Sequence, residues 1–502
     1  MSEAPDPDEG RAEPRDPTIR RTTVAVSARW SLVGLVSKQA ARIGFSILLA
    51  RILGPTNFGI VGQATIYLAF STVFLDMGLA SALIQRKEID DETIGTATWL
   101  NLGAVGLLVA VTQVVAGPWA RLFDTPELEN VLRVLSIDFV LIGFAVIPTA
   151  LLTRRLNFRM LAMAEVAGVF VGGAAGVAAA WMGAEYWALV VQRLLTDLVY
   201  AIFVIAAVGR VVLSWSRTAL RAILGFSARV FGSEVMRFLS QNADNTLIAL
   251  RLGPTALANY ALSYRVLLLP VQILSQTANR LVFPIFSRLN DEPERQADLF
   301  LRVSATLALV VTPPMFLVAL CAPRGVPIVF GDDWDAAVRP MQILAVVSIM
   351  SAVVGVAGGV MLAKGRADWS LRWGIVTTTA LIGGFVVGLQ WGIDGVAWSY
   401  LIVGTPLAVI QIGFVQYLIP YSWGGYLKAI RPAGIGGAAM VVLWLATERL
   451  LEGTLGDFWL LVTASLLALG LYAAMLRFVW PKVLADQIDF ARLMVKRKLG
   501  SE

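Results

Sequence analysis

Residues 30–56 read WSLVGLVSKQAARIGFSILLARILGPT and decide the fold class. The run is mostly apolar up to residue 50, and Lys38 and Arg42 are the charged positions within it. An α-helix needs about 20 such residues to cross a hydrocarbon core about 30 Å thick. Gly54 and Pro55 then supply a common helix stop. The stretch therefore predicts a membrane span that carries two cations and ends in a turn.

The same alternation of apolar runs and short polar turns continues along the 502 residues, of which 57% are hydrophobic and 15% are charged. This composition is typical of an integral membrane protein. We therefore expect an all-α polytopic fold with fourteen transmembrane helices, at residues 30–50, 58–83, 94–117, 131–153, 160–182, 186–208, 219–241, 255–283, 299–321, 340–363, 370–390, 395–418, 428–447 and 457–479.

Basic residues segregate between the two sets of connecting segments that these spans define. With the N-terminal tail inside, 27 of the 41 Lys and Arg residues fall on the cytoplasmic side, 6 on the other side and 8 within the spans. Lys and Arg in short loops are retained in the cytoplasm. The distribution therefore predicts that both termini are cytoplasmic.

An internal repeat relates the two halves of the chain. Three short motifs recur in the same order, at residues 54–56 and 253–255, 123–124 and 330–331, and 183–185 and 392–394. Each motif is weak alone, but three in order predict a duplicated six-span unit, and an even number of spans gives both copies the same orientation. The expected organisation is a disordered cytoplasmic tail at 1–29, an N-lobe at 30–208, a C-lobe at 209–418, two further helices within 419–480 and a basic cytoplasmic tail at 481–502.

The residue inventory excludes most catalytic templates. The chain has no His and a single Cys, Cys321, which excludes His-based acid/base catalysis, a zinc site of the usual His/Cys kind and an internal disulfide. The sequence also lacks the Gly-x-x-x-x-Gly-Lys-Ser/Thr phosphate loop, so direct use of ATP is not expected. We expect no cofactor and no metal. The net charge of +6 fits anionic lipid headgroups rather than nucleic acid.

Ionisable side chains within the spans are the candidates for function. Each costs roughly 2.5 to 3.5 kcal/mol at the centre of a lipid-facing helix, so we expect them to face an interior cavity. Lys38 and Arg42 share a helix face at i, i+4, and Glu234 and Arg237 begin a second stripe that continues to Asp244. Because Lys38 and Arg237 are equivalent in the repeat, the two stripes predict a basic cleft between the lobes.

Structural interpretations compete with functional ones for several of these residues. Arg193 and Asp197 are four residues apart in the sixth span and are expected to form an ion pair. The glycine-rich runs at 171–176 and 355–359 predict close helix packing. For the carboxylates within the spans, ion or proton coupling and a purely structural role remain alternatives; these residues are Asp76, Asp138, Asp197, Glu234 and Asp244.

The pattern as a whole resembles a known family. The Leu-Gly-Pro motif after the first and seventh spans, ASALIQRK at residues 80–87, and PEL at residues 126–128 leading to Leu135 are similar to the polysaccharide exporters and Wzx-type lipid-linked oligosaccharide flippases. Among these, the colanic acid exporters of the multidrug/oligosaccharidyl-lipid/polysaccharide superfamily resemble the chain most. The resemblance runs from about residue 30 to about residue 417 and is most specific over residues 79–195.

That resemblance implies a carrier rather than an enzyme. It implies a protein of the bacterial inner membrane that moves polyprenyl diphosphate-linked oligosaccharides to the periplasmic leaflet by alternating access, for exopolysaccharide or lipopolysaccharide biosynthesis. Membrane lipids are implied partners, together with a polysaccharide polymerase and export machinery. Cations would hold the diphosphate, and the basic residues that the family places along its cavity correspond here to Lys38, Arg42, Arg51, Arg237, Arg251 and Arg265.

Two other functions remain alternatives. A drug/cation antiporter of the same superfamily would want an acidic cavity lined by aromatic side chains. A membrane glycosyltransferase or polysaccharide polymerase would need a sizeable loop outside the membrane that carries catalytic residues, and the sequence has no such loop between its predicted spans.

Overall fold

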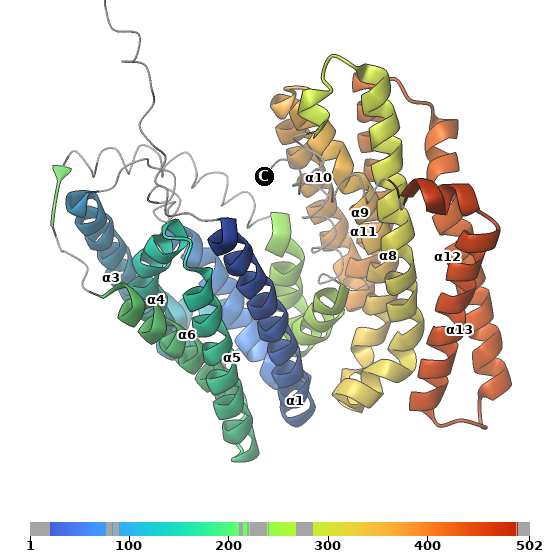
Figure 1. Cartoon of the computed structure of the whole chain (residues 1–502). Coiled ribbons are helices and arrows are strands. Elements are labelled where there is room, and N and C mark those ends of the chain that lie inside the picture. The colour runs from blue at the N-terminus through green and yellow to red at the C-terminus, as the bar shows by residue number, and fades with distance from the viewer. Residues whose placement is uncertain are drawn as a thin grey trace, which may run out of the picture. The chain divides into compact units, whose positions relative to one another are not determined.

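The computed structural model describes residues 21–76, 83, 90–209, 214–217, 220, 238, 240–267, 285–487 and 489. These residues are almost entirely helical (Figure 1), and the described part of the chain has no β-strand, only an isolated bridge between Glu452 and Leu455. The chain is an all-α polytopic membrane protein. Its helices are α1 (Arg21–Asp76), α3 (Asp91–Leu122), α4 (Glu127–Arg154), α5 (Phe158–Trp181), α6 (Trp187–Val208), α8 (Pro293–Phe330), α9 (Val338–Ala363), α10 (Ala367–Gly388), α11 (Gly392–Leu418), α12 (Trp423–Leu451) and α13 (Asp457–Phe478), with short 3-10 helices η1 (Asp332–Ala337) and η2 (Leu389–Trp391).

The helices agree with the expected spans wherever the structure describes them. Within one to three residues at their ends, the expected spans coincide with described helices, except that residues 77–82 of the second span, most of the seventh and the second half of the eighth lie outside the described residues; residues 240–267 are helical as well. Ten helical segments of the described residues are long and apolar enough to cross a membrane. The segment Ser37–Leu75 covers parts of the first two expected spans, and the segment Ala367–Leu418 covers the eleventh and twelfth. The number fourteen stays a prediction. Helix α1 starts at Arg21, so residues 21–29, assigned to the tail from the sequence, are helical.

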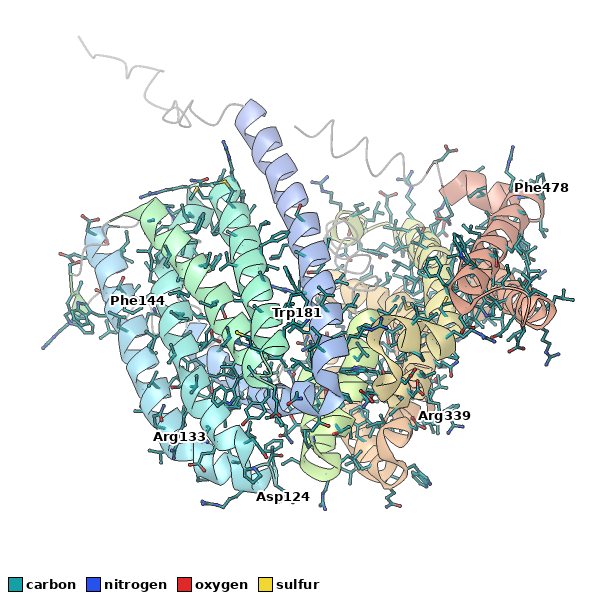
Figure 2. The ribbon with its side chains drawn as sticks, turned by 90° about the horizontal axis from the view of Figure 1, so that it is seen from below. Asp124, Arg133, Phe144, Trp181, Arg339 and Phe478 are labelled. Carbon is teal, nitrogen blue, oxygen red and sulfur yellow. The ribbon has the colours of Figure 1, made fainter. Side chains whose placement is uncertain are left out.

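Large apolar side chains on the outside of the helices are explained by lipid. Phe144 is 50% exposed, Trp181 is 76% exposed and Phe478 is 81% exposed (Figure 2). A soluble protein rarely exposes apolar side chains over such a large area. Inside the membrane these side chains contact hydrocarbon, and the buried face of each helix packs against its neighbours.

The described residues fall into two compact units whose boundaries differ from those of the expected lobes. The first comprises residues 1–49, 69–116 and 130–235, and the second comprises 50–68, 117–129 and 236–502. Residues 50–68 therefore belong with the C-terminal half of the chain.

Polar contacts explain why residues 50–68 join the second unit. The indole Nε1 of Trp334 donates to the backbone oxygen of Ala50 at 3.1 Å, and Arg51 donates to the backbone oxygen of Ile328 at 2.9 Å. The hydroxyls of Thr56 and Thr255, which the repeat makes equivalent, lie 2.9 Å apart and share a hydrogen bond. This repeat motif therefore contacts its own copy.

The repeated motifs also share a backbone conformation. Gly54 and Gly253 have φ of 69° and 81°, and Gly183 and Gly392 have φ of 81° and 69°. A positive φ is the conformation that glycine adopts without a steric penalty, so these positions specify where a helix ends or bends. Two further pairs of positive φ, which include residues other than glycine, are Asp124 with Gly331 and Leu156 with Gly365.

Glycines of α5 allow close packing against α6, as the run at 171–176 predicts. A Cβ added at Gly172 would lie 2.1 Å from Oγ1 of Thr196 and 2.5 Å from the backbone oxygen of Gln192. The same prediction is wrong for the run at 355–359 on α9. Among the described residues, a Cβ on any of its three glycines would meet nothing within 4 Å.

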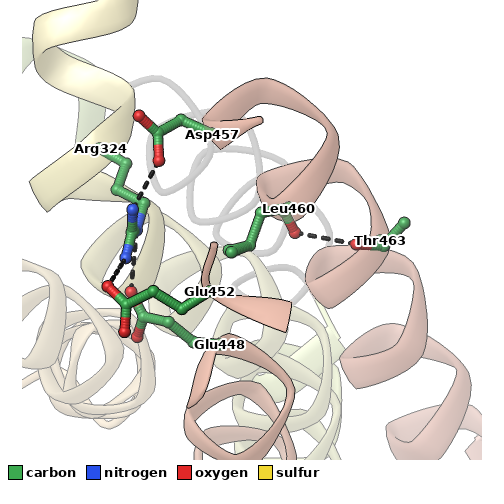
Figure 3. A network of polar contacts seen from close by, with 6 residues as sticks. All are labelled: Arg324, Glu448, Glu452, Asp457, Leu460 and Thr463. Atoms are coloured by element: carbon green, nitrogen blue, oxygen red, sulfur yellow. Dashed lines mark hydrogen bonds and ion pairs between the residues drawn. The ribbon is translucent and has the colours of Figure 1, made fainter. Parts of the chain in front are cut away.

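Polar contacts at two places along α8 join it to α12 and α13. Arg324 on α8 donates to Glu448 and Glu452 at the end of α12 at 3.0 and 2.7 Å, and to Asp457 at the start of α13 at 2.5 Å (Figure 3). Further along, the hydroxyl of Tyr472 donates to the backbone oxygen of Leu309 at 2.9 Å. The α12–α13 pair is therefore held against α8 by charge-assisted contacts as well as by apolar packing.

The glycine packing yields a stability prediction. We expect Gly172→Ala to lower the free energy of unfolding by about 1 to 3 kcal/mol, because the added methyl group forces α5 and α6 apart. Gly359→Ala is the matched control, since open space surrounds it and Ala favours a helix. Thermal unfolding of the purified protein in detergent measures both. Equal melting temperatures for the two variants would contradict the packing.

The Arg324 cluster yields a second stability prediction. We expect Arg324→Ala to destabilise the protein by about 1.5 to 3 kcal/mol, the range for hydrogen bonds to charged groups, because it removes the shared partner of three carboxylates. Arg339→Ala is the control, since the Arg339 side chain is 82% exposed and its contact with Asp394 is 3.7 Å long. The same unfolding measurement applies, and an effect of Arg339→Ala as large as that of Arg324→Ala would contradict the prediction.

Candidate functional site

The first compact unit contains a cluster of charged side chains on α4 and α6. Asp138 on α4 is fully buried, and its Oδ2 accepts a hydrogen bond from Nε of Arg193 on α6 at 2.8 Å. The prediction that Arg193 forms its ion pair with Asp197 is therefore wrong, because the guanidinium pairs with Asp138. Helical spacing identifies only partners on the same helix, whereas a buried carboxylate on α4 requires the cation more than the less buried Asp197 does.

Asp197 joins the cluster through the other carboxylate. The charges of Asp138, Arg193 and Arg42 all act on its carboxyl group. Arg42, on α1, is exposed, whereas Asp197 is half-buried. The cluster thus brings together two carboxylates and one guanidinium in the interior, with a second guanidinium at its accessible edge.

Lys38 belongs to a neighbouring ion pair. Its Nζ donates to Oε2 of Glu165 on α5 at 2.7 Å, and its side chain is only 17% exposed. Lys38 has no acidic partner on its own helix, but the fold supplies one from a helix more than a hundred residues away. This cation is therefore neutralised in the structure, and its predicted ligand-binding role stays a prediction.

A tyrosine lies between the two sets of charges. Tyr200 on α6 shares a hydrogen bond of 2.9 Å with the hydroxyl of Thr149 on α4, and the charges of both Glu165 and Asp197 act on it. Ionisable groups on α1, α4, α5 and α6 of this unit therefore interact electrostatically with one another. No pattern in the sequence points to Tyr200, since an isolated Tyr in a membrane-spanning helix has no characteristic spacing.

The remaining predicted cations fall in the second unit or outside the description. Arg51, Arg251 and Arg265 all have exposed side chains. One N–H of the Arg51 guanidinium donates a hydrogen bond to the backbone oxygen of Ile328. Arg237, Glu234 and the side chain of Asp76 lie outside the part of the chain that the structure describes. The expected basic cleft between the lobes therefore stays a prediction.

Asp244 forms a separate buried site in the second unit. Its side chain accepts hydrogen bonds from the hydroxyls of Tyr260 at 3.1 Å and Tyr400 at 3.2 Å, and from the backbone N–H of Asn245 at 2.7 Å. The sequence identified Asp244 but not the two tyrosines, of which Tyr260 lies in the same helical stretch and Tyr400 on α11. The carboxylate has neutral hydrogen-bond donors, so its site differs in kind from the cluster around Asp138.

Comparison with known proteins agrees with this architecture. A model of the family described as "Polysaccharide biosynthesis protein" matches residues 48–339, more than half of the chain. The lipopolysaccharide biosynthesis protein WzxC of Escherichia coli (strain K12) is 27% identical over 395 residues, which cover 77% of this chain and 79% of that protein. The succinoglycan biosynthesis transport protein ExoT of Rhizobium meliloti (strain 1021) is 26% identical over 446 residues, covering 87% of this chain and 88% of that protein.

Solved structures show a similar fold. The lipid II flippase MurJ in an inward closed conformation superposes with a TM-score of 0.73 at 13% identity, covering 90% of this chain and all of that chain (100%). An inward-facing multidrug resistance transporter of the MATE family superposes with a TM-score of 0.61 at 16% identity, covering 81% of this chain and 98% of that chain. These likenesses establish the fold and leave the substrate open.

The Asp138–Arg193 pair yields a folding prediction. We expect Arg193→Gln to destabilise the protein by about 3 to 5 kcal/mol, because it leaves the buried Asp138 without its cation. Adding Asp138→Asn to the same variant should restore most of the lost stability, since a neutral amide tolerates burial better than a carboxylate. Membrane abundance and thermal unfolding measure both effects. An Arg193→Gln protein as stable as the wild type would contradict the ion pair between Arg193 and Asp138.

Proposed function

Because the chain belongs to the polysaccharide biosynthesis protein family, we propose that it is a flippase for lipid-linked oligosaccharides. In this proposal it moves polyprenyl diphosphate-linked repeat units across the inner membrane for the synthesis of a surface polysaccharide. The observation that carries the proposal is a polytopic helical body with the fold of a lipid flippase, matched along most of its length by proteins named for polysaccharide biosynthesis and transport.

The proposed mechanism is alternating access without a chemical step. The diphosphate needs cations that replace its water of hydration, and guanidinium groups do so through paired N–H donors. Arg42, Arg51, Arg251 and Arg265 are the exposed candidates among the described residues. Lys38 has a different part in the proposal, since its pair with Glu165 fixes α1 against α5 beside Arg42. The polyprenyl tail stays in the lipid throughout.

The location and partners follow from the same proposal. The distribution of Lys and Arg between the two sides of the membrane favours a cytoplasmic position for both termini. The donor of the repeat unit is then the cytoplasmic leaflet, and the consumer is a polymerase with its export machinery on the periplasmic side.

An antiporter of drugs or cations is the second candidate. Two observations favour it: the likeness to a multidrug transporter and the acidic site where tyrosines surround Asp244. However, Asp244 is only 1% exposed, which leaves a cationic drug no direct access to the carboxylate in this structure. A drug-resistance assay of cells with and without the protein separates the two functions.

Deletion of the gene tests the flippase function. We expect the surface polysaccharide to disappear while its complete lipid-linked repeat unit still forms and accumulates on the cytoplasmic leaflet. An enzyme that builds the glycan would instead leave the unit incomplete. In liposomes, the purified protein should expose added lipid-linked oligosaccharide in the opposite leaflet without ATP. Normal delivery of the unit to the periplasmic leaflet in the deletion strain, with no second flippase present, contradicts the proposal.

Within that liposome assay, we expect Arg42→Ala to weaken the apparent affinity for substrate about tenfold or more. A hydrogen bond to a charged group contributes roughly 1.5 to 3 kcal/mol, and 1.4 kcal/mol corresponds to a factor of ten. Arg42→Lys should retain part of the affinity. Arg339→Ala, which removes an exposed cation in weak contact with Asp394, is the control and should transport normally.

A further inference from the structure

Helices α12 and α13 lie side by side (Figure 1) and differ in charge between their two ends. At the end with the connecting turn, Glu448, Glu452 and Asp457 contact Arg324. Away from that turn, the sequence has no Asp or Glu in residues 395–447 or 458–485. The cations of these two stretches all lie toward the opposite end of the helix pair, and they are Lys428, Arg431, Arg477 and Lys482.

Arg431 on α12 and Arg477 on α13 lie at the same level along the pair. A Cβ added at Gly436 would lie 2.8 Å from Cε2 of Tyr472, so these two positions face each other. Arg431 precedes Gly436 by five residues, Arg477 follows Tyr472 by five, and the two helices run in opposite directions. Both arginines are therefore about 7.5 Å from the same point of contact, on the side away from the turn.

The cations at this end have no anionic partner in the protein. The side chains of all four are exposed, and none forms an ion pair or a side-chain hydrogen bond with another described residue. The next acidic residue, Asp486, follows Lys482 by one turn and is itself exposed. Arg324 at the other end differs in this respect, because three carboxylates surround it. This basic end of the pair therefore favours an anion from outside the chain.

The surroundings of these cations are those of a membrane boundary. Trp423 begins α12 and Trp480 follows α13, and tryptophan is enriched where hydrocarbon meets water. Ile435 and Val442 follow Arg431 by four and eleven residues on the same face of α12, and they are 41% and 68% exposed. A cation at the boundary is thus continuous with an apolar surface that reaches into the hydrocarbon.

From this arrangement we propose that the basic end of the α12–α13 pair is a binding site for the headgroup of an anionic phospholipid. The phosphate contacts Arg431 and Arg477, and the acyl chains follow the exposed apolar face of α12. The inference goes beyond the proposed function, since it concerns helices outside the two predicted lobes and a lipid that is not transported.

The chemistry of the site selects the net charge of the headgroup. A guanidinium group donates two parallel N–H bonds to phosphate, and each ammonium group adds a compact positive charge. A zwitterionic headgroup brings its own cation into this surplus of positive charge, where no carboxylate of residues 395–447 or 458–485 can accept it. Lipids with a net negative charge are therefore preferred, as they are at basic sites between membrane helices generally.

Native mass spectrometry of the full-length protein tests the site. The probes are phosphatidylglycerol and phosphatidylcholine with identical acyl chains, added in equal amounts to the protein in detergent. The wild type should retain phosphatidylglycerol preferentially. Arg431→Gln/Arg477→Gln should lower that preference about tenfold or more, because each Lys or Arg near an anionic headgroup contributes about a factor of five. Arg431→Lys/Arg477→Lys should retain most of it. A wild type that retains both lipids equally contradicts the proposal.

Arg288→Gln/Arg372→Gln is the matched control. It removes the same charge from exposed side chains, but Asp291 and Asp368 lie three and four residues from them in the chain. This variant should keep the wild-type preference. An equal loss in both double variants would mean that only the net charge of the protein matters, and the local site would be refuted.

Thermal unfolding supplies a readout that separates binding from folding. In phosphatidylcholine, Arg431→Gln/Arg477→Gln should unfold at the wild-type temperature, because its exposed side chains lose no contact within the described residues. Phosphatidylglycerol should then stabilise the wild type and the control more than this variant. If the double variant does not fold, Lys428→Gln/Lys482→Gln, which changes the two ammonium groups instead, should still lower the preference, and an unchanged preference there overturns the site.

Competition identifies the occupant. Polyprenyl diphosphate carries phosphate and a lipid tail as well, so it is added to the wild type and to Arg431→Gln/Arg477→Gln beside phosphatidylglycerol. We expect the double variant to lose phosphatidylglycerol and to bind polyprenyl diphosphate as the wild type does. Loss of polyprenyl diphosphate alone would assign the two arginines to the transported lipid and overturn the proposal. None of these measurements requires transport, so failure of the flippase function leaves their outcome unaffected.

Discussion

The cost of an unpaired charge in an apolar interior determines how the helices of this protein are joined. Insertion of one ionised side chain at the centre of a lipid-facing helix costs roughly 2.5 to 3.5 kcal/mol. The chain places several such residues in its spans, and the structure joins them across helices: Asp138 on α4 to Arg193 on α6, and Lys38 on α1 to Glu165 on α5. Each ion pair specifies which two helices pack together, which apolar surfaces alone do not. The charges are therefore constraints on packing before they are candidates for function.

The backbone turns recur in the two halves of the chain, whereas the charged cluster around Asp138 does not. Positive φ angles recur at Gly54 and Gly253 and at Gly183 and Gly392, so the two halves bend the chain at equivalent points. The charged cluster around Asp138 does not recur. At the offset that relates Gly183 to Gly392, the cluster residues Asp138, Arg193 and Asp197 fall on apolar positions, namely Val347, Ile402 and Pro406. Helix ends depend on local backbone geometry, which a duplication carries over, whereas an ion pair between helices depends on which side chains meet across them.

The sequence predicted the helices well because length and hydrophobicity are local properties. Apolar runs located the described helices, and Gly-Pro motifs located the bends. The partners of charged residues were less predictable. The i, i+4 rule joined Arg193 to Asp197, but the cation pairs with Asp138, which lies 55 residues away in the chain. Packing at the two glycine-rich runs was equally hard to predict. Gly172 packs against α6, whereas a Cβ added at Gly359 would meet no atom of the described residues within 4 Å. Which helix faces a given side chain depends on tertiary packing, and a single sequence does not encode that in any spacing.

Two clusters in the chain have more carboxylates than guanidinium groups, and burial decides how each surplus is accommodated. At the ends of α12 and α13, Arg324 meets three carboxylates, of which Glu452 is 62% exposed and Asp457 is 58% exposed. Water solvates the excess negative charge at the two exposed carboxylates there. Around Arg193 the Asp138 side chain is only 1% exposed, and solvation is not available to it. Asp138 therefore depends on its ion pair with Arg193, and the charge of the exposed Arg42 acts on Asp197 beside it. The interior cluster thus draws cations from two helices, whereas one guanidinium at the solvated ends of α12 and α13 is sufficient to join three helices.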